Sequence, residues 1–395
     1  MKRPTLMLAA AALCGAAAAH ADKYPGLAPT PPMGWNTWNT FAGNISEALV
    51  EQTADALVAT GMRDAGYNYV VVDDCWERID RDADGSLVAD PKKFPHGMKA
   101  LGDYLHARGF KFGLHNCAGK TTCAGFPGGR GHEFQDARTY ASWGVDFLKY
   151  DWCDHGTANG PETYRTMSDA LRAAKRPILL SICEWGQNQP WLWAEPVAQM
   201  WRTTGDVAPQ YQHVGTRSWE HGWKDLLDQN VGLEGYAGPE HWNDPDMLEA
   251  GNPGLTDAES RAQFSLWCVL AAPLIAGNDV RSMTPQLRDL LTNRRAIAID
   301  QDPLGREGFR YRIDPDKEIW AKPLSGGEWA VCILNPRPAA ERVRVDLREL
   351  TFLTEQYYSV TNVWTGQSAG QSTDPQAAEL ASHDVLFLRL KPSKG

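Results

Sequence analysis

The sequence has little positive charge and, beyond its first residues, no long apolar run. Its 395 residues contain 39 Lys and Arg against 49 Asp and Glu, which gives a formal net charge of −10. An acidic chain repels nucleic acid and anionic membrane surfaces, so neither is expected as a partner. No segment after residue 21 approaches the roughly 20 apolar residues that a transmembrane helix requires. Internal repeats and low-complexity linkers are also absent, and the hydrophobic content of 43% predicts well-packed domains.

The one long apolar run stands at the amino terminus. Lys2 and Arg3 precede the apolar stretch 6–19, and Ala19-His20-Ala21 has the small residues of a cleavage site. This pattern is typical of a signal peptide. We therefore expect residues 1–21 to be removed and the chain to be exported, either to a periplasm or out of the cell.

Strand-like and helix-like segments alternate between residues 27 and 300. The expected strands are 33–38, 69–74, 111–115, 145–150, 178–183, 199–202, 240–247 and 274–277, and the expected helices are 47–65, 98–108, 132–143, 161–175, 219–229, 257–271 and 286–291. Eight strands in a segment of roughly 250 residues are typical of a (β/α)8 TIM barrel. A doubly wound open sheet is the alternative, but no Gly-rich phosphate turn follows the first strand.

After residue 305 the pattern changes to short strands separated by turns. Strands are expected over 309–313, 318–323, 329–334, 343–347, 358–364 and 383–390, with no convincing helix between them. This predicts a small antiparallel β-sandwich over residues 305–393. The predicted fold is thus an α/β barrel over 27–300 followed by a C-terminal β-sandwich domain.

Functional side chains of a barrel gather at the carboxyl ends of its strands. The residues at or near these ends are Trp35, Asp73, Asp74, Lys149, Asp151, Cys183, Trp185, Arg202, Asp206, Asp244 and Asp246. Carboxylates dominate this set, together with two cations and two large aromatic side chains, and it includes no phosphate cradle. Such a set suits a neutral ligand rich in hydroxyl groups.

Two of these carboxylates, Asp151 and Asp206, follow the fourth and the sixth predicted strands. Glycoside hydrolysis commonly uses two carboxyl groups, one that attacks the sugar and one that protonates the leaving oxygen. Lys149 lies two residues before Asp151 and therefore on the same face of the strand, where its charge would keep Asp151 ionised. Asp206 would then carry the proton. The structural alternative is that these acids cap helices or form salt bridges.

The remaining strand-end residues fit a sugar site as well. Asp73 and Asp74 could accept hydrogen bonds from hydroxyl groups, and the competing metal site has no diagnostic ligand spacing. Trp35 and Trp185 could stack on a pyranose ring or pack in the core. The sequence therefore predicts no metal and no cofactor.

A series of short strings resembles glycoside hydrolase family 27, the family of α-galactosidases and α-N-acetylgalactosaminidases. The matching strings are Pro32–Trp38, Val72–Trp76, Thr122–Gly125, Ser142–Asp146, Lys149–Asp151, Cys183–Gly186, Trp201–Asp206 and Trp242–Leu248, followed by Leu324–Gly327, Val363–Gly366 and Ser382–Asp384. They occur in order, span nearly the whole predicted barrel and extend into the second domain. A series of this kind is far more specific than any one motif.

The resemblance implies an exported, retaining α-galactosidase that acts on oligosaccharides or on galactomannan side chains. It implies that Asp151 is the nucleophile and Asp206 the acid/base. The implied sugar-binding residues are Trp35 as a stacking ring, Asp73, Asp74 and Lys149 for the hydroxyls at carbons 3, 4 and 6, Arg202 near the 2-hydroxyl, and Met247 in the pocket wall.

The resemblance also bears on specificity. Cys183 and Trp185 are similar to the bulky arrangement that leaves no room for a 2-acetamido group, which implies galactose over N-acetylgalactosamine. Asp74 resembles the galactosidase form of the residue at the 6-hydroxyl, where a Glu would suggest a β-L-arabinopyranosidase. The alternatives are these two activities of the same family and a non-catalytic galactose-binding protein.

The cysteines only partly follow the family's pattern. Cys123 and Cys153 resemble one of its disulfides, but the usual partner of Cys75 is missing from Phe41-Ala42-Gly43. Because the second and third strands are neighbours, we expect Cys75 to pair with Cys117.

Three further residues depart from the family's pattern. Trp152 stands where the family has Asn, and His115-Asn116 replaces a Tyr-Ser pair. We expect these changes at the pocket rim, where they would alter the leaving-group preference.

Overall fold

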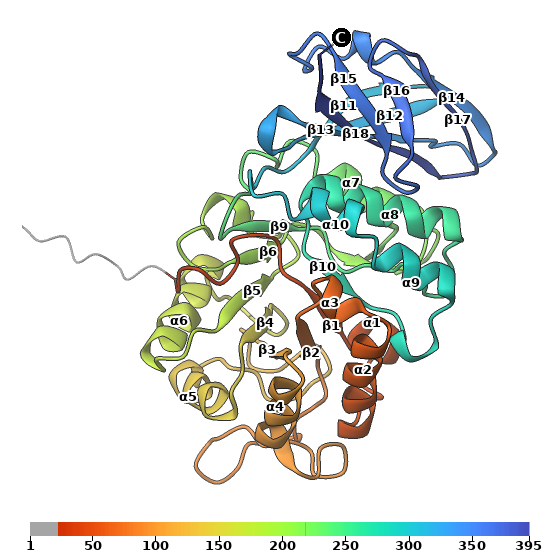
Figure 1. Ribbon diagram of the computed structural model, residues 1–395. Helices are drawn as coiled ribbons and strands as arrows, with labels where there is room; N and C mark the ends of the chain where they lie inside the picture. Colours follow the sequence, from red (N-terminus) through yellow and green to blue (C-terminus); the bar gives the residue numbers. More distant parts are fainter. Residues whose placement is uncertain (1–22, 218, 395) are drawn as a thin grey trace, which may run out of the picture.

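The computed structural model describes residues 23–217 and 219–394, so the predicted signal peptide lies outside the described residues. Eight parallel strands form one curled sheet in the order β10-β1-β2-β3-β4-β5-β6-β9 (Figure 1). Their bounds are β1 Met33–Asn36, β2 Tyr69–Val72, β3 Lys111–Cys117, β4 Phe147–Asp151, β5 Leu179–Cys183, β6 Met200–Arg202, β9 Trp242–Asp244 and β10 Leu274–Ala276. Beyond β9, Leu248 forms a parallel bridge with Ala276 and brings the two sheet edges together. The predicted barrel fold is confirmed.

Alternation along the strands divides the barrel core into two layers. Tyr69 and Val71 of β2 pack with Phe147 of β4 inside the barrel. Val70 and Val72 face the surrounding helices instead. Successive strand residues point to opposite faces, so the parity of a residue decides whether it reaches the barrel interior.

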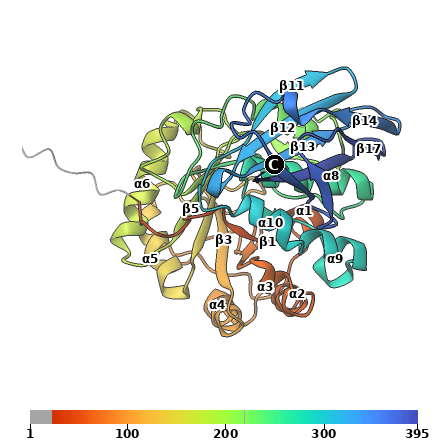
Figure 2. The ribbon, with the colours of Figure 1, turned by 45° about the horizontal axis from the view of Figure 1, so that its top comes forward.

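Helices follow most strands and cover the outside of the sheet (Figures 1 and 2). They are α1 Trp38–Phe41, α2 Glu47–Ala59, α3 Met62–Ala65, α4 Gly97–Ala107, α5 Glu133–Trp143, α6 Gly160–Ala173, α7 Trp223–Gln229, α8 Asp257–Leu270, α9 Pro285–Leu291 and α10 Arg294–Asp300. Thr256 and Glu259 form a capping box that fixes the start of α8. The predicted single helix 47–65 is wrong, because Gly61 adopts a φ of +83° and separates α2 from α3.

The C-terminal domain consists of antiparallel sheets in the orders β11-β12-β13-β18-β15-β16 and β14-β17. The strand bounds are β11 Phe309–Asp314, β12 Lys317–Pro323, β13 Trp329–Leu334, β14 Glu341–Val345, β15 Tyr358–Asn362, β16 Ser368–Gln371, β17 Gln376–Leu380 and β18 Val385–Pro392. The predicted sandwich is confirmed, but β16 and β17 were missed. Neither contains a β-branched or aromatic residue, and they pair with the edges of β15 and β14.

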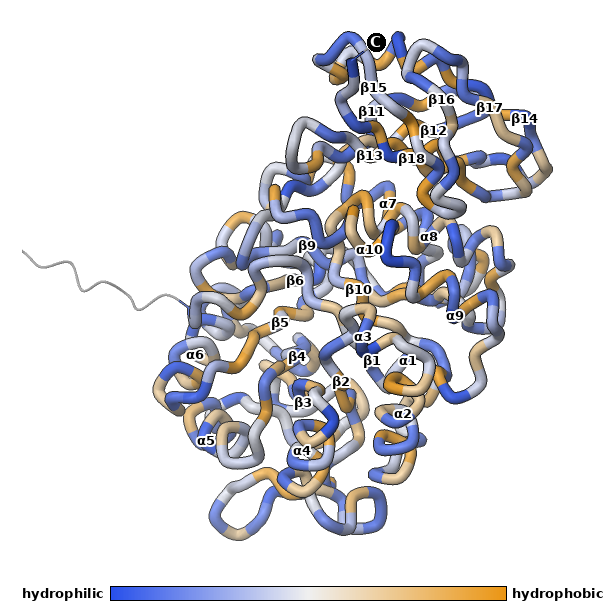
Figure 3. Tube along the Cα trace, in the orientation of Figure 1, coloured by the Kyte–Doolittle hydropathy of each residue, from blue (hydrophilic) through white to orange (hydrophobic). Residues whose placement is uncertain are grey.

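The two domains meet across α8, whose surface is buried almost all round. Arg261 of α8 forms an ion pair of 2.5 Å with Asp384, and Lys224 of α7 one of 3.0 Å with Glu318. Hydrophobic stretches recur along the strands at the centre of each domain, while many of the outer loops are hydrophilic (Figure 3). Within the described part of the chain, none of the helices has the length and apolar character needed to cross a membrane.

Candidate active site

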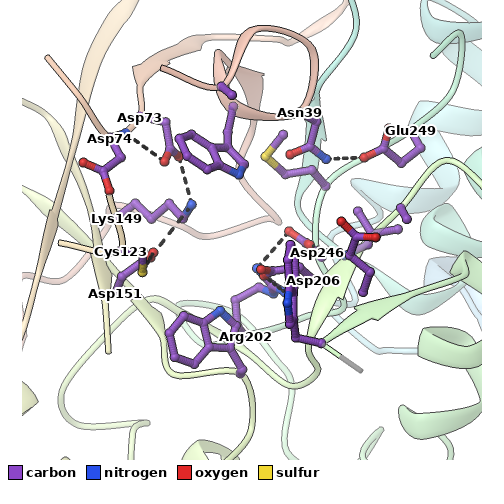
Figure 4. A pocket seen from close by; sticks show the side chains of 18 of the residues that line it. Asn39, Asp73, Asp74, Cys123, Lys149, Asp151, Arg202, Asp206, Asp246 and Glu249 are labelled. Atoms are coloured by element: carbon purple, nitrogen blue, oxygen red, sulfur yellow. Dashed lines mark hydrogen bonds and ion pairs between the residues drawn. The ribbon is translucent and has the colours of Figure 1, made fainter. Parts of the chain in front are cut away.

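A pocket of about 370 Å³ opens at the carboxyl ends of the barrel strands (Figure 4). It is lined by Trp38, Asn39, Ala42, Asp73, Asp74, Cys123, Lys149, Asp151, Trp185, Arg202, Asp206, Val207, Ala208, Pro209, Arg217, Trp219, Glu220, Asp246, Met247 and Glu249. Most of the residues predicted from the sequence are therefore brought together here. Trp35, Cys183 and Asp244 are not among the lining residues.

Asp151 ends β4 and is almost fully buried at the inner wall of the pocket. Its Oδ2 lies 3.2 Å from Nε2 of His115, and its Oδ1 lies 3.8 Å from Nζ of Lys149. Burial raises the pKa of Asp151, but the charges of Lys149 and His115 outweigh it and hold the pKa well below its usual range. The carboxylate is therefore ionised at neutral pH, as covalent catalysis requires.

His115 lies beside Lys149 in the register of β3 with β4, so its ring reaches the barrel interior. Burial lowers the pKa of His115, but the carboxylates of Asp151, Asp73 and Asp74 outweigh this and raise it to about 9. The imidazole is therefore a second cation against Asp151. Sequence reasoning placed His115 at the pocket rim, which is wrong. His115 lies two residues before Cys117, which pairs with Asp151 in the register of β3 with β4. Residues two apart in a strand point to the same face, and this spacing was the signal in the sequence.

Glu77 is a buried carboxyl group near this cluster, and neither of its oxygens has a hydrogen-bond partner within the described structure. Burial, followed by repulsion from Asp74, raises the pKa of Glu77 to about 8, although His115 lowers it. Glu77 is therefore mostly protonated at neutral pH. A neutral Glu77 avoids the cost of an unpaired buried charge.

These two groups predict a loss of stability at alkaline pH. Folding raises the pKa of Glu77 from 4.5 to about 8 and that of His115 from 6.5 to about 9. Their stabilisation is complete below the lower value of each pair and is lost as pH rises through the higher value. The melting temperature should therefore fall as pH rises from 4.5 to about 9 in thermal unfolding, with the Glu77 contribution lost by about pH 8. Glu77→Gln cannot lose a proton and should show a smaller fall, whereas an equal fall in both proteins would exclude Glu77 as a cause.

Asp73 and Lys149 lie next to Asp151 on the same side of the inner pocket (Figure 4). Oδ2 of Asp73 accepts hydrogen bonds from Nζ of Lys149 at 2.8 Å and from Nδ2 of Asn36 at 2.7 Å. Oδ2 of Asp74 accepts one from the amide of Ala124 at 3.0 Å. These contacts fix both carboxylates at the pocket wall, where they can accept hydrogen bonds from a ligand's hydroxyl groups.

Asp206 lies on the outer side of the pocket and is partly exposed to solvent. Nη2 of Arg202 lies 3.1 Å from its Oδ1, and Nη1 of the same guanidinium lies 3.0 Å from Oδ1 of Asp246. Asp246 also accepts a hydrogen bond from the amide of Val207 at 2.8 Å. Arg202 and Asp246 together hold the segment that carries Asp206, which leaves this carboxyl group accessible to a ligand at the pocket mouth.

The predicted position of Trp35 in the pocket is wrong. Trp35 pairs with Val70 of β2 and, like Val70, faces the surrounding helices. Its side chain is fully buried and donates a hydrogen bond to the carbonyl of Asn278 at 2.8 Å. Trp38, at the start of α1, lines the pocket in its place. Trp38 follows the end of β1, and this position just beyond a strand end was the signal that sequence reasoning missed.

Cys183, predicted in the pocket, and Trp152 and Asn116, predicted at its rim, also lie deeper than expected. Cys183 is buried below the pocket, with its Sγ 3.6 Å from Nη1 of Arg202. Trp152 is buried and stacks on Tyr164 of α6, and Asn116 is fully buried. Trp152 and Asn116 do not line the pocket and cannot touch a leaving group directly.

The structure forms the disulfide between Cys123 and Cys153, which joins two of the loops around the pocket. The expected pairing of Cys75 with Cys117 is wrong, since both thiols are free. Cys75 has a φ of +73°, and its Sγ lies against Gly43. Sγ of Cys117 instead contacts the carbonyl oxygen of Cys153 at 3.2 Å. Neighbouring strands thus do not suffice for a disulfide when the side chains point apart.

The arrangement provides an ionised carboxylate held between two cations and a second, accessible carboxyl group in the same pocket. Tryptophan rings and hydrogen-bond acceptors surround them. Among residues 23–217 and 219–394, no three His, Cys, Asp or Glu side chains cluster in a way that could hold a metal ion. The protein side chains themselves supply both groups needed for nucleophilic and acid/base chemistry.

Comparisons with known proteins agree with this site. Residues 30–302 match the family model described as alpha galactosidase A, and residues 314–390 match that of the alpha galactosidase C-terminal beta sandwich domain. The chain is 48% identical to alpha-galactosidase A of Cellvibrio japonicus over 388 residues, which cover 95% of each chain.

Solved structures share the whole fold. Alpha-galactosidase I from Mortierella vinacea has a TM-score of 0.89 at 33% identity, covering 93% of this chain and 98% of its own. The Saccharomyces cerevisiae α-galactosidase solved with raffinose has a TM-score of 0.89 at 31% identity, covering 94% of this chain and all of its own. The chain therefore belongs to the α-galactosidases of glycoside hydrolase family 27 and is a glycoside hydrolase.

Proposed function

We propose that the protein is a retaining α-galactosidase that removes terminal, non-reducing α-D-galactosyl residues from oligosaccharides or galactomannan. The observation that carries this proposal is the pair of carboxyl groups in one pocket, with Asp151 held ionised and Asp206 accessible. The yeast relative solved with raffinose, a galactose-containing trisaccharide, supports an oligosaccharide as substrate.

In the first step, Asp151 attacks the anomeric carbon and forms an ester bond to it. The bond between this carbon and the leaving oxygen breaks, and Asp206 gives its proton to that oxygen. Lys149 and His115 keep Asp151 ionised before the attack. They also stabilise the carboxylate as a leaving group in the next step.

In the second step, Asp206 takes a proton from water, and the water oxygen attacks the anomeric carbon. The ester bond breaks, Asp151 leaves as a carboxylate, and Asp206 is protonated again. Two successive inversions at one carbon give net retention of the α configuration.

The inner pocket is suited to hold the galactosyl ring. Asp73, Asp74 and Lys149 offer charged hydrogen-bond partners for its hydroxyl groups, and we assign the stacking role to Trp38 instead of Trp35. Arg202 stands near the side expected for the 2-hydroxyl, with Met247 in the wall. The bulk of Trp185, with Cys183 beneath it, favours galactose over N-acetylgalactosamine.

A panel of 4-nitrophenyl glycosides tests the proposal. The α-D-galactoside should react at least about a hundredfold faster than the N-acetyl-α-D-galactosaminide or the β-L-arabinopyranoside, because each of these adds or removes a group that the pocket must accommodate. NMR of the first product should show α-galactose. Initial β-galactose would exclude retention, and no turnover of any glycoside would favour a galactose-binding protein.

We also propose that residues 27–300 form the catalytic unit and residues 305–393 the second domain. The signal-peptide pattern at residues 1–21 supports export of the protein. Mass spectrometry of the protein recovered from outside the cytoplasm should give a mature chain that begins near residue 22.

A further inference from the structure

Residues 208–222 form a strap that leads from β7 (Asp206–Val207) to α7 along the pocket mouth, with residue 218 outside the described residues. The strap returns as β8 (Glu220–His221), and Asp206 pairs with Glu220 in the register of β7 with β8. The amide of Asp206 donates a hydrogen bond to the carbonyl of Trp219 at 3.2 Å. The backbone of Trp219 is thus attached directly to that of the proposed acid/base.

The side chains of this part of the strap line the pocket. Arg217, Trp219 and Glu220 belong to its wall, yet the residues proposed to hold galactose lie on the inner side. Trp219 is 54% exposed, which is unusual for so large an apolar ring. Nη1 of Arg217 forms an ion pair of 2.8 Å with Glu220, and its guanidinium lies 5.5 Å from the centre of the Trp219 ring.

The base of the strap is anchored on both domains. The carbonyls of Gln210 and Tyr211 accept hydrogen bonds from the first amides of α7, at 3.0 and 2.9 Å. The ring of Tyr211 stacks on His383 of the C-terminal domain, with 3.5 Å between the ring centres and 3° between their planes. These contacts hold the strap in place, so Trp219 is presented on a fixed support rather than on an isolated loop.

We propose that Arg217, Trp219 and Glu220 form the binding site for the leaving-group sugar, a neutral pyranose joined to the galactosyl residue. This inference rests on the proposed function. The acid/base must contact the oxygen between the two sugars, so the leaving sugar has to lie on the accessible side of Asp206. The Trp219 ring offers an apolar face for stacking there. Arg217 and Glu220 offer a donor and an acceptor for hydroxyl groups.

Two substrates distinguish the effect of the leaving-group site from the effects of the two catalytic carboxyl groups. Melibiose has a pyranose leaving group, whereas α-galactosyl fluoride releases only fluoride. The fluoride still needs Asp151 for the first step and Asp206 for hydrolysis of the ester in the second. We expect Trp219→Ala to lower kcat/KM for melibiose roughly ten- to a hundredfold, as for other Trp side chains at the centre of a binding site. Its kcat/KM for the fluoride should stay within about twofold of the unchanged protein.

Three further variants complete the experiment. Val214→Ala lies on the same strap, is 85% exposed and does not line the pocket, so it should leave both rates unchanged. Trp219→Phe should recover part of the melibiose rate, since a ring remains. Arg217→Ala should lower the melibiose rate selectively, and it provides the decisive comparison if Trp219→Ala does not fold.

The outcomes are distinguishable. Equal loss of both rates in Trp219→Ala, or no change in either, would overturn the leaving-group site. If Trp219→Ala does not fold, an Arg217→Ala protein with an unchanged ratio of the two rates would overturn it equally. A wild-type protein that cleaves neither melibiose nor the fluoride would instead contradict the proposed function itself.

Discussion

Asp151→Asn is expected to lower kcat by a factor of about 10⁴ or more, which is typical when a catalytic nucleophile is removed. The amide has nearly the same shape but cannot form the ester intermediate. It also leaves Lys149 and His115 without one of their shared counter-charges. Lys149 keeps its contact with Asp73 and His115 can release its proton, so the variant should fold. Steady-state rates on the nitrophenyl galactoside and far-UV circular dichroism measure the two effects.

Asp103→Asn is a matched control, because this carboxylate is exposed on α4 and forms its ion pair with Lys99, one turn away on the same helix. It should keep full activity. Asp151→Gly with added azide should regain turnover and yield β-galactosyl azide, since azide then attacks from the side that the carboxylate vacated. Near-normal activity of Asp151→Asn, or an α-azide from Asp151→Gly, would remove Asp151 from the nucleophile role.

The second large effect is expected for Asp206→Asn. Without a proton donor, kcat/KM for melibiose should fall by roughly 10²–10⁴, the usual contribution of general acid/base catalysis. For α-galactosyl fluoride the first step needs no proton, so its loss should be much smaller when azide replaces water as the second nucleophile. Arg202 would retain its ion pair with Asp246, which should preserve the local structure.

The azide product again identifies the role. Asp206→Asn should yield α-galactosyl azide, because azide attacks the ester formed with Asp151 and the two inversions still occur. Rates on the two substrates and NMR of the azide product provide the measurements. A β-azide, or equal losses on melibiose and on the fluoride with azide, would contradict an acid/base role for Asp206.

Local sequence was informative where one short segment determines the secondary structure. The apolar, β-branched run at Tyr69–Val72 forms a strand in any parallel sheet, and the capping residues Ser46 and Thr256 define helix starts without help from distant residues. Local sequence was insufficient for β16 and β17. These segments contain no β-branched or aromatic residue, and they are strands because β15 and β14 present edges with which they pair.

The cysteines show a similar limit. Cys75 and Cys117 stand at the ends of neighbouring strands, which made a disulfide plausible from sequence. The positive φ at Cys75 turns its thiol toward Gly43, and this turn depends on the loop around it. A disulfide needs converging side chains, and strand order carries no information on their direction.

The sequence by itself determined the alternation of the eight barrel strands with helices and the presence of acidic residues at the strand ends, because both follow from short-range patterns of side chains. Only the tertiary structure decided that Trp38 rather than Trp35 enters the pocket, and that His115 supplies a charge to Asp151. It also brought Trp219 beside Asp206. The physical reason is that charge, burial and access depend on distances between residues far apart in the chain, which are fixed only when the barrel closes.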